Sequence, residues 1–361
     1  MLSGSGRQCR QDFDGVAGQQ RRGGQLEARE DAAHGSGKTG FLFRIGKGSA
    51  IAWAVLWLQI VPSYGWPLCR GKTFYAAPSS FCFENPRLAV KHSLTMSDIE
   101  TIRRKNGFII DMDGVVYHGN RLLPGTVEFL GWLRAQKKKF LFLTNSSQST
   151  PLELHQKMAR LGVSVDADHF YTSALATAAF LQSQRPGGSA FVIGEAGLTN
   201  ALYDVGFALN EVNPDYVIVG ESRGYDYERL THAVRLVLGG ARLIATNPDV
   251  TGPTDKGLVP ATGALIAPIE LCTGSKAYYI GKPNPLIMRH ALRVLGCQPA
   301  ESVIIGDRMD TDIIAGIESE IETVLVLSGV TSEDDLRKFA YRPHHVLAGV
   351  GALIENAQPN K

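Results

Sequence analysis

The feature that most constrains how this chain can fold is a regular alternation of strand-like and helix-like runs between residues 107 and 326. Short apolar runs such as KFLFLTN, DYVIVG and SVIIGD are separated by longer amphipathic stretches such as NPLIMRHALRVLG. Runs of this kind predict buried strands, and their alternation with helices predicts parallel sheets covered by helices on both faces. Because such sheets bind ligands at the carboxyl ends of their strands, the sequence predicts a site at one strand edge of an α/β fold.

Polar side chains stand where four of these runs end. They are Asp111 after FII, Thr144 and Asn145 in FLFLTN, Lys282 after YYIG, and Asp307 after VIIG. A second aspartate, Asp113, follows Asp111 with one residue between them, so in an extended segment both carboxylates point to the same side. Two carboxylates this close repel each other, and one of them takes up a proton unless a cation lies between them. The pattern therefore indicates a metal site, a shared proton or an exposed loop.

Residues of these types suit phosphoryl transfer. A carboxylate such as Asp111 can attack phosphorus and form an acyl phosphate, and the repulsion between the carboxylate and a phosphate dianion must then be neutralised. Mg²⁺ is suited to this because it binds one or two carboxylates together with substrate oxygens, and Asp111 and Asp307 could provide the carboxylates. Lys282 would keep Asp111 ionised, and Asp113 could protonate the leaving oxygen and later activate water.

Four segments resemble the four motifs of the haloacid-dehalogenase superfamily. DMDGV resembles the first motif, FLTNSS the second, GKPNP the third and GDRMDTD the fourth. The resemblance implies a hydrolase in which Asp111 is the nucleophile and Asp113 the general acid and base. It also implies a Mg²⁺ site at Asp111, Asp113 and Asp307, with Asp312 in its outer shell. The implied phosphate-binding residues, with hydroxyl, backbone N–H and ammonium donors, are Thr144, Asn145, Ser146 and Lys282.

The spacing between the motifs indicates a large insertion. Asp113 and Thr144 are 31 residues apart (144 − 113), which leaves room for one strand–helix–strand passage, whereas Thr144 and Lys282 are 138 residues apart (282 − 144). The insertion has a βαβ pattern of its own, and this arrangement resembles the NagD-type, or class IIA, phosphatases. The resemblance implies a Rossmann-like parallel-sheet core at 96–187 and 278–361, with an inserted α/β cap of the C2 type at 188–277.

The predicted function is a Mg²⁺-dependent phosphomonoesterase that hydrolyses a small phosphorylated metabolite through an aspartyl phosphate. Resemblance to nucleotide monophosphatases makes a ribonucleoside 5′-monophosphate such as UMP the expected substrate, with phosphoglycolate, pyridoxal phosphate and sugar phosphates as alternatives. A catalytically silent protein that binds a phosphorylated ligand is an alternative of a different class. A receiver domain of a signalling protein also places Asp, Thr and Lys at strand ends, but it needs neither Asp113 nor an inserted cap.

Several polar residues of the predicted cap are candidates for substrate contact. Asn247 and Asp249 lie in ATNPD, within a long turn-rich segment, and ordinary turn chemistry explains them equally well. His118 lies close to the first motif, and we interpret it as a surface residue or a residue of the site's rim. Further candidates at predicted strand ends are Glu195, Glu221 and Arg223.

Residues 1–95 differ from the rest of the chain. They contain 12 Lys and Arg against 6 Asp and Glu, net +6, whereas the remainder contains 25 against 29, net −4. They are predicted to be a disordered or non-native extension, with Met96 as the natural start. The apolar run at 50–61 is too short to cross a bilayer.

Charge and cysteine usage bear on partners and location. The acidic balance of the body argues against a nucleic-acid partner, and we expect no membrane partner. An odd, scattered set of 5 cysteines is typical of a reducing compartment, so a cytoplasmic location is predicted. Monomer and homo-oligomer are both compatible with this sequence.

Overall fold

The computed structural model describes residues 96–254 and 257–354, and these belong to one compact unit. Within them, the first sheet, here called the core sheet, has six strands that all run parallel. In spatial order these are β15 (His345–Leu347), β14 (Glu322–Val326), β13 (Ser302–Gly306), β1 (Gly107–Ile110), β4 (Lys139–Thr144) and β5 (Phe170–Thr172). The prediction for residues 1–95 lies outside the described residues.

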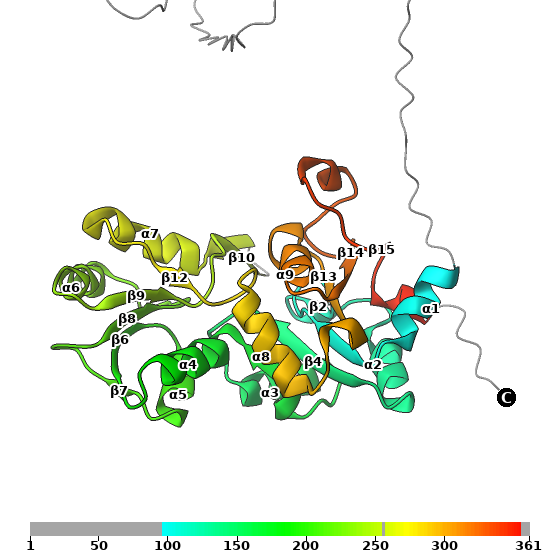
Figure 1. Ribbon diagram of the computed structural model, residues 1–361, viewed down its shortest axis with the longest axis horizontal. Coiled ribbons are helices and arrows are strands. Elements are labelled where there is room, and N and C mark those ends of the chain that lie inside the picture. The colour runs from blue at the N-terminus through cyan, green and yellow to red at the C-terminus, as the bar shows by residue number, and fades with distance from the viewer. Residues whose placement is uncertain (1–95, 255–256, 355–361) are drawn as a thin grey trace, which may run out of the picture. The chain divides into compact units, whose positions relative to one another are not determined.

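A second sheet, here called the cap sheet, is built from the inserted segment and is also parallel throughout its described strands (Figure 1). Its order is β12 (Tyr278–Tyr279), β9 (Arg242–Ala245), β8 (Tyr216–Val219), β6 (Ser189–Ile193) and β7 (Ala208–Leu209). Two antiparallel pairs stand apart from both sheets. They are β2 (Tyr117–His118) with β3 (Arg121–Leu122), and β10 (Thr251–Thr254) with β11 (Gly257–Pro260).

Helices connect most of these strands. The α-helices are α1 (Met96–Arg104), α2 (Thr126–Ala135), α3 (Pro151–Arg160), α4 (Ser173–Gln184), α5 (Ala196–Asp204), α6 (Tyr227–Leu238), α7 (Thr262–Thr273), α8 (Pro285–Leu295) and α9 (Ile314–Glu318). Shorter 3₁₀ and π turns are η1 (Ala167–His169), η2 (Pro299–Glu301), η3 (Met309–Ile313), η4 (Asp334–Lys338) and η5 (Val350–Leu353). The parallel sheets confirm the predicted α/β fold, whereas the predicted domain boundaries at 187/188 and 277/278 stay predictions.

Side-chain alternation along β1 explains how the layers pack, because successive residues of a strand face opposite sides of the sheet. Ile109 joins a buried cluster with α4, α5, α8 and residues of the cap sheet, whereas Phe108 and Ile110 pack on the other face against α2 and α3. α6 and α7 cover the opposite face of the cap sheet, above it in Figure 1, with α4 and α5 below. One apolar cluster therefore continues from the core sheet into the cap sheet.

The register of the core sheet places two of the predicted site residues together. β1 pairs with β13 so that Ile110 lies opposite Ile305, and Asp111 and Asp307 therefore emerge at the same carboxyl edge. Thr144 ends β4, on the other side of β1. The strand before Lys282 differs from the prediction, because β12 pairs with β9 in the cap sheet and not with a strand of the core sheet. Lys282 reaches the rim of the core sheet from the loop between β12 and α8.

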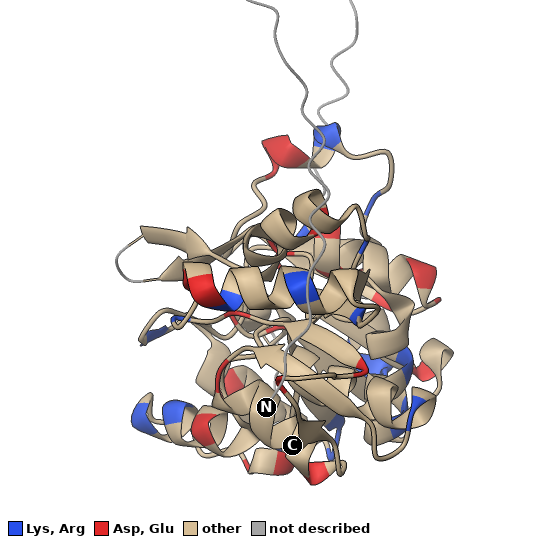
Figure 2. Ribbon diagram, turned by 90° about the vertical axis from the view of Figure 1, so that its left-hand side faces the viewer, with Lys and Arg blue, Asp and Glu red and all other residues tan. Residues whose placement is uncertain are grey.

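Helix hydropathy and surface charge bear on the predicted absence of membrane and nucleic-acid partners. Among the described residues, no helix has both the length and the apolar character needed to span a membrane. In Figure 2, basic and acidic residues are interspersed along the elements in view. The absence of a nucleic-acid partner stays a prediction.

Candidate active site

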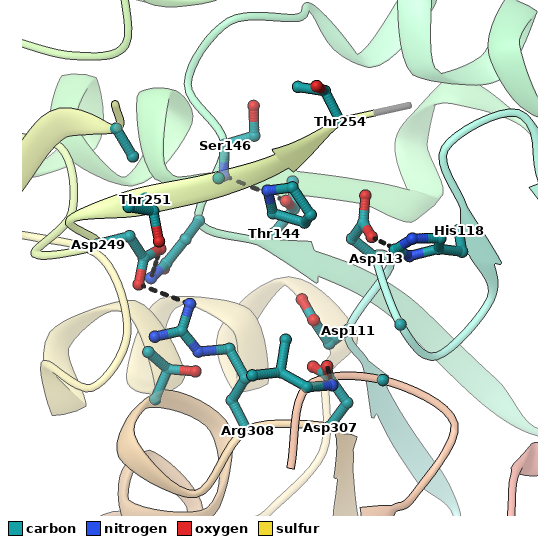
Figure 3. A pocket seen from close by; sticks show the side chains of 18 of the residues that line it. Asp111, Asp113, His118, Thr144, Ser146, Asp249, Thr251, Thr254, Asp307 and Arg308 are labelled. Atoms are coloured by element: carbon teal, nitrogen blue, oxygen red, sulfur yellow. Dashed lines mark hydrogen bonds and ion pairs between the residues drawn. The ribbon is translucent and has the colours of Figure 1, made fainter. Parts of the chain in front are cut away.

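A tight turn after β1 aims two carboxylates at one cavity. The backbone N–H of Asp111 donates to the Ile305 carbonyl at 2.8 Å, which extends the pairing with β13 by one residue. The chain then turns at Gly114, whose φ of +79° is readily adopted only by glycine, and the Gly114 N–H donates to the Tyr117 carbonyl at 2.8 Å. Asp111 and Asp113 both line a cavity of about 650 Å³ at the carboxyl edge of the core sheet (Figure 3).

Lys282 is the buried cation of this cavity, with a side chain only 3% exposed. Its ammonium donates to Asp111 Oδ1 at 2.6 Å, to Asp312 Oδ1 at 2.7 Å and to the Leu143 carbonyl at 3.1 Å, so each of its three protons has an acceptor. Burial opposes the charge on Lys282, but Asp111 and Asp312 outweigh it and raise the pKa of the ammonium above its ordinary value. Lys282 is therefore charged and fixed.

Three carboxylates converge beside this lysine. Among the described residues, Asp111, Asp307 and Asp312 form the group of potential metal ligands, with one carboxylate oxygen from each lying within 4.8 Å of the others. Burial is the main reason why the pKa of Asp111 lies well above its ordinary value, and burial with the neighbouring Asp312 raises the pKa of Asp307 to about 7. One lysine does not balance three carboxylates, since the sum of −3 and +1 is −2.

The donor set fits a divalent cation. Carboxylate oxygens are the ligands that Mg²⁺ prefers, and a charge of +2 would balance the excess at these three aspartates. Both oxygens of Asp312 are already engaged, because Oδ1 accepts from Lys282 and Oδ2 accepts from the Arg308 N–H at 3.2 Å and the Thr311 hydroxyl at 3.3 Å. Asp111 and Asp307 are thus better available to a metal than Asp312. Asp113 lies outside this group, and its predicted metal contact stays a prediction.

Asp307 is held from behind by the loop that follows β14. The Val330 N–H donates to Asp307 Oδ2 at 2.7 Å. Gly329 lies so close that a Cβ atom there would meet the same oxygen at 2.0 Å, and a Cβ at Gly114 would meet it at 2.4 Å. Two glycines therefore make room for this carboxylate. The segment LSGV carries no titratable side chain, so sequence reasoning gave Gly329 no role.

The predicted phosphate-binding residues of the second motif also line the cavity, with Thr144 and Ser146 across it from Asp307. Thr144 and Ser146 line it, and the Ser146 N–H donates to the Thr144 hydroxyl at 3.1 Å (Figure 3). Asn145 also lines it, but its side chain binds the backbone of Lys282, accepting from the N–H at 2.7 Å and donating to the carbonyl at 2.9 Å. The amide of Asn145 thus joins the second motif to the third.

Asp113 lies at the open side of the cavity near His118. The His118 Nδ1 is 3.5 Å from Asp113 Oδ1, and the two side chains are 65% and 39% exposed (Figure 3). His118 belongs to β2 and lines the cavity, which agrees with its interpretation as a rim residue. Asp113 is the most accessible carboxylate of the first motif and is placed to exchange protons with a ligand or with solvent.

The predicted substrate contacts from the cap differ from one another. Asp249 lines the cavity, and it accepts from the Asn145 amide at 3.0 Å and pairs with Arg308 at 3.5 Å. Asn247 is fully buried, is not part of the cavity wall, and donates to the Asn145 carbonyl at 2.7 Å and to Glu221 at 2.8 Å. Only Asp249 of this pair faces the cavity.

Other candidates are also distinguished by the structure. Glu221 is buried and lines the cavity. Glu195 and Arg223 do not line it, and Glu195 accepts from the Arg223 N–H at 2.6 Å. Sequence reasoning gave no role to Arg308, whose guanidinium pairs with Asp310 at 2.8 Å and with Asp249 at 3.5 Å. The pair with Asp249 is drawn in Figure 3. A basic residue inside the acidic GDRMDTD motif was the signal that could have found this arginine.

Comparisons with known proteins agree with this geometry. Residues 108–208 match the family model of haloacid dehalogenase-like hydrolases, and residues 279–353 match a second, HAD-hydrolase-like model. The chain is similar to dihydroxyacetone phosphatase of Corynebacterium glutamicum, with 45% identity over 69% of this chain and 90% of that protein. It is similar to ribonucleotide monophosphatase NagD of Escherichia coli K12, with 44% identity over 68% of this chain and 96% of that protein.

A solved structure shows the same likeness in three dimensions. The 4-nitrophenylphosphatase from Thermotoga maritima superposes with a TM-score of 0.69 and 34% identity, over 72% of this chain and 99% of that one. The matched family models cover the segments that carry the four motifs. The chain therefore belongs to the haloacid-dehalogenase superfamily, among the NagD-type class IIA phosphatases, and it is a phosphoric monoester hydrolase that acts on small phosphorylated substrates.

Proposed function

We propose that this phosphatase depends on Mg²⁺ and hydrolyses a ribonucleoside 5′-monophosphate such as UMP through an aspartyl phosphate on Asp111. The observation that carries the mechanism is the buried contact of 2.6 Å between Lys282 and Asp111, beside Asp307. A cavity of about 650 Å³ supports a substrate of nucleotide size. The 45% identity with dihydroxyacetone phosphatase favours a second candidate, a small hydroxylated phosphate such as dihydroxyacetone phosphate or a sugar phosphate.

In the proposed first half-reaction, an oxygen of Asp111 attacks phosphorus and the bond from phosphorus to the leaving oxygen breaks. Lys282 binds Oδ1 of Asp111 and favours its carboxylate form, which leaves the other oxygen for the attack. Thr144 and the Ser146 side chain donate to the phosphate oxygens. Asp113 gives its proton to the leaving oxygen, which departs as an alcohol.

In the second half-reaction, Asp113 accepts a proton from water while that water attacks the phosphorus of the acyl phosphate. The bond from phosphorus to Asp111 breaks, so the Asp111 carboxylate is restored and inorganic phosphate leaves. A Mg²⁺ ion held by Asp111 and Asp307 would neutralise the charge between carboxylate and phosphate. Asp312 supports this arrangement by orienting Lys282 at 2.7 Å.

The experiment that tests this function measures phosphate release from a panel of monophosphates with Mg²⁺ and with EDTA. The panel contains UMP and other nucleotides, dihydroxyacetone phosphate, phosphoglycolate, pyridoxal phosphate and sugar phosphates. We expect turnover only with the metal and the highest kcat/KM on UMP. A higher kcat/KM on dihydroxyacetone phosphate or on sugar phosphates would select the second candidate, and full turnover in EDTA would exclude the metal.

The role of Asp113 predicts a dependence on the leaving group. Asp113→Asn is expected to lower kcat/KM by about 10²–10⁴-fold for an alcohol leaving group, since the general acid is lost. The loss should be smaller for 4-nitrophenyl phosphate, because 4-nitrophenolate leaves without a proton. The measurement is kcat/KM on both substrates for wild type and variant. Equal losses on both would contradict the general-acid role.

The packing around Asp307 predicts that Gly329 is needed for activity. Gly329→Ala is expected to lower kcat/KM by about 10²-fold, because a displacement near 1 Å at a catalytic group has this effect. It should also raise the Mg²⁺ concentration needed for half-maximal activity. Gly349→Ala is the matched control, since a Cβ there has its nearest neighbour, in Ser328, at 3.8 Å. A Gly329→Ala enzyme with an unchanged metal requirement would contradict the prediction.

We further propose a cytoplasmic location and a function without nucleic-acid or membrane partners. Free thiols support a reducing compartment, since Cys272 and Cys297 are unpaired and Cys272 is exposed. Size-exclusion chromatography with light scattering would distinguish a monomer from a homo-oligomer.

A further inference from the structure

Glu221 is a buried carboxylate that the proposed mechanism does not use. It follows β8 of the cap sheet, and the residue is 8% exposed. Its Oε2 accepts from the Ser147 N–H at 3.0 Å and from the Ser147 hydroxyl, and its Oε1 accepts from the Asn247 amide at 2.8 Å. No ion pair within the described segments involves Glu221. Burying a carboxylate among neutral donors is costly, so a carboxylate retained in this position points to a function.

The first of these contacts reaches the turn at the end of the second motif. Ser147 comes directly after Ser146 and is fully buried. The cap encloses this turn from two further points. The Gly197 N–H at the start of α5 donates to the Gln148 carbonyl at 2.9 Å, and a Cβ at Gly220 would meet the Ser147 hydroxyl oxygen at 2.5 Å. The turn is therefore shaped by the cap as well as by the core.

The second contact reaches the third motif through two amides. Asn247 donates both to Glu221 and, at 2.7 Å, to the Asn145 carbonyl. The side chain of Asn145 in turn binds the backbone N–H and carbonyl of Lys282. A continuous chain of hydrogen bonds thus runs from Glu221 to the segments that carry Ser146 and Lys282.

We propose that Glu221 is a positioning residue, which from the cap fixes the turn that presents Thr144 and Ser146 to the substrate's phosphate. The proposal rests on the phosphate-binding role of that turn, which is part of the proposed function. A carboxylate is required because it only accepts hydrogen bonds and can serve both the Ser147 and the Asn247 donors. Glutamine has a single acceptor oxygen, so its NH₂ group would face one of the two N–H donors. Donors that bind phosphate must be held to a fraction of an ångström, so loosening this turn weakens phosphate binding.

The test compares Glu221→Gln with wild type in the full chain. The measurements are kcat and KM on 4-nitrophenyl phosphate, the inhibition constant of inorganic phosphate, and the midpoint of thermal unfolding. We expect kcat/KM to fall and the phosphate inhibition constant to rise, each by about tenfold or more. Glu195→Gln is the matched control, because Glu195 also follows a cap strand and accepts a backbone N–H, but does not contact the core turn. Its constants should stay within about twofold of wild type.

A second pair of variants keeps the test decisive if Glu221→Gln does not fold. Glu221→Asp retains the charge but shortens the reach, and Ser147→Ala removes one donor. The phosphate inhibition constant should rise in both variants. In the double variant it should rise by less than the product of the two single fold-changes, because both substitutions affect the same contact. A lower unfolding temperature with an unchanged inhibition constant would overturn the proposal and leave Glu221 a structural role. Equal effects in Glu195→Gln would also overturn it. A wild-type enzyme that releases no phosphate from the whole panel would refute the proposed function instead.

Discussion

Replacing Asp111 with asparagine is expected to lower kcat by at least about 10⁴-fold, because loss of a nucleophile costs this much or more. The fold should remain intact. The pKa of Asp111 is raised by burial and by its acidic neighbours, which means that its charge disfavours the folded state in the absence of a metal. Removing that charge relieves the repulsion, and Lys282 keeps Asp312 as a partner at 2.7 Å. In EDTA, the unfolding temperature of Asp111→Asn should therefore equal or exceed that of wild type.

The measurement combines steady-state hydrolysis of 4-nitrophenyl phosphate with thermal unfolding of the same preparations. Asp166→Asn makes the same chemical change at an exposed aspartate and should leave kcat unchanged. A near-normal kcat in Asp111→Asn would reject Asp111 as the nucleophile. A large fall in its unfolding temperature would show that the carboxylate is needed for the fold. A loss of kcat would then not identify Asp111 as the nucleophile.

Replacing Lys282 with methionine is expected to destabilise the protein by about 3–5 kcal/mol at pH 8 in EDTA, the range seen when one partner of a buried ion pair is removed. Methionine fills the space of the side chain but removes the ammonium that Asp111 and Asp312 bind. Added Mg²⁺ should recover part of this loss by supplying positive charge. The variant should also be inactive, because nothing then orients Asp111 or keeps it ionised.

The loss of stability should depend on pH with a definite sign. Burial raises the pKa of Asp307 to about 7, and the pKa of Asp111 also lies well above its ordinary value. A carboxyl group whose pKa is higher in the folded state binds more protons when folded, so its charge destabilises the protein as the pH rises through that pKa. Below pH 7 Asp307 becomes neutral, and the site then needs a cation less. The deficit of Lys282→Met should therefore shrink between pH 8 and pH 5.

Urea unfolding of wild type and variant at both pH values, in EDTA, measures this difference. Lys276→Met is the matched control, because Lys276 pairs with Glu270 at 3.3 Å while its own side chain is 84% exposed. Exposed pairs of this kind contribute at most about 1 kcal/mol. A deficit of the same size at pH 5 and pH 8 would contradict the view that Lys282 compensates these carboxylates.

The residues of the site could be predicted from the sequence because each stands at a fixed place in the local pattern, at the end of a strand. Asp111, Thr144 and Asp307 each end an apolar run, and the carboxyl ends of neighbouring parallel strands must meet at one edge. The structure places all three residues on the wall of one cavity. The alternation that predicted the strands also determines the layers, since Phe108 and Ile109 face opposite sides of the core sheet.

Short strands could not be predicted from the local sequence pattern. β15 has only three residues and adds an edge strand to the core sheet, which no periodicity can reveal. The segment from Thr251 to Pro260 was interpreted as a turn-rich stretch, but its ends pair as β10 and β11 and form part of the cavity wall. The strand before Lys282 was assigned to the core but pairs in the cap sheet, because a two-residue strand carries no information about its pairing partner.

The sequence by itself determined the α/β fold, the four motifs and the polar residues that each strand delivers, because strand periodicity and turn chemistry are local. Only the tertiary structure decided which partner each buried polar group meets. Glu221 is 74 residues from Ser147, and Lys282 is 137 residues from Asn145. Which buried donor meets which acceptor over such separations depends on how the two sheets pack, and that packing is a property of the whole chain rather than of any segment.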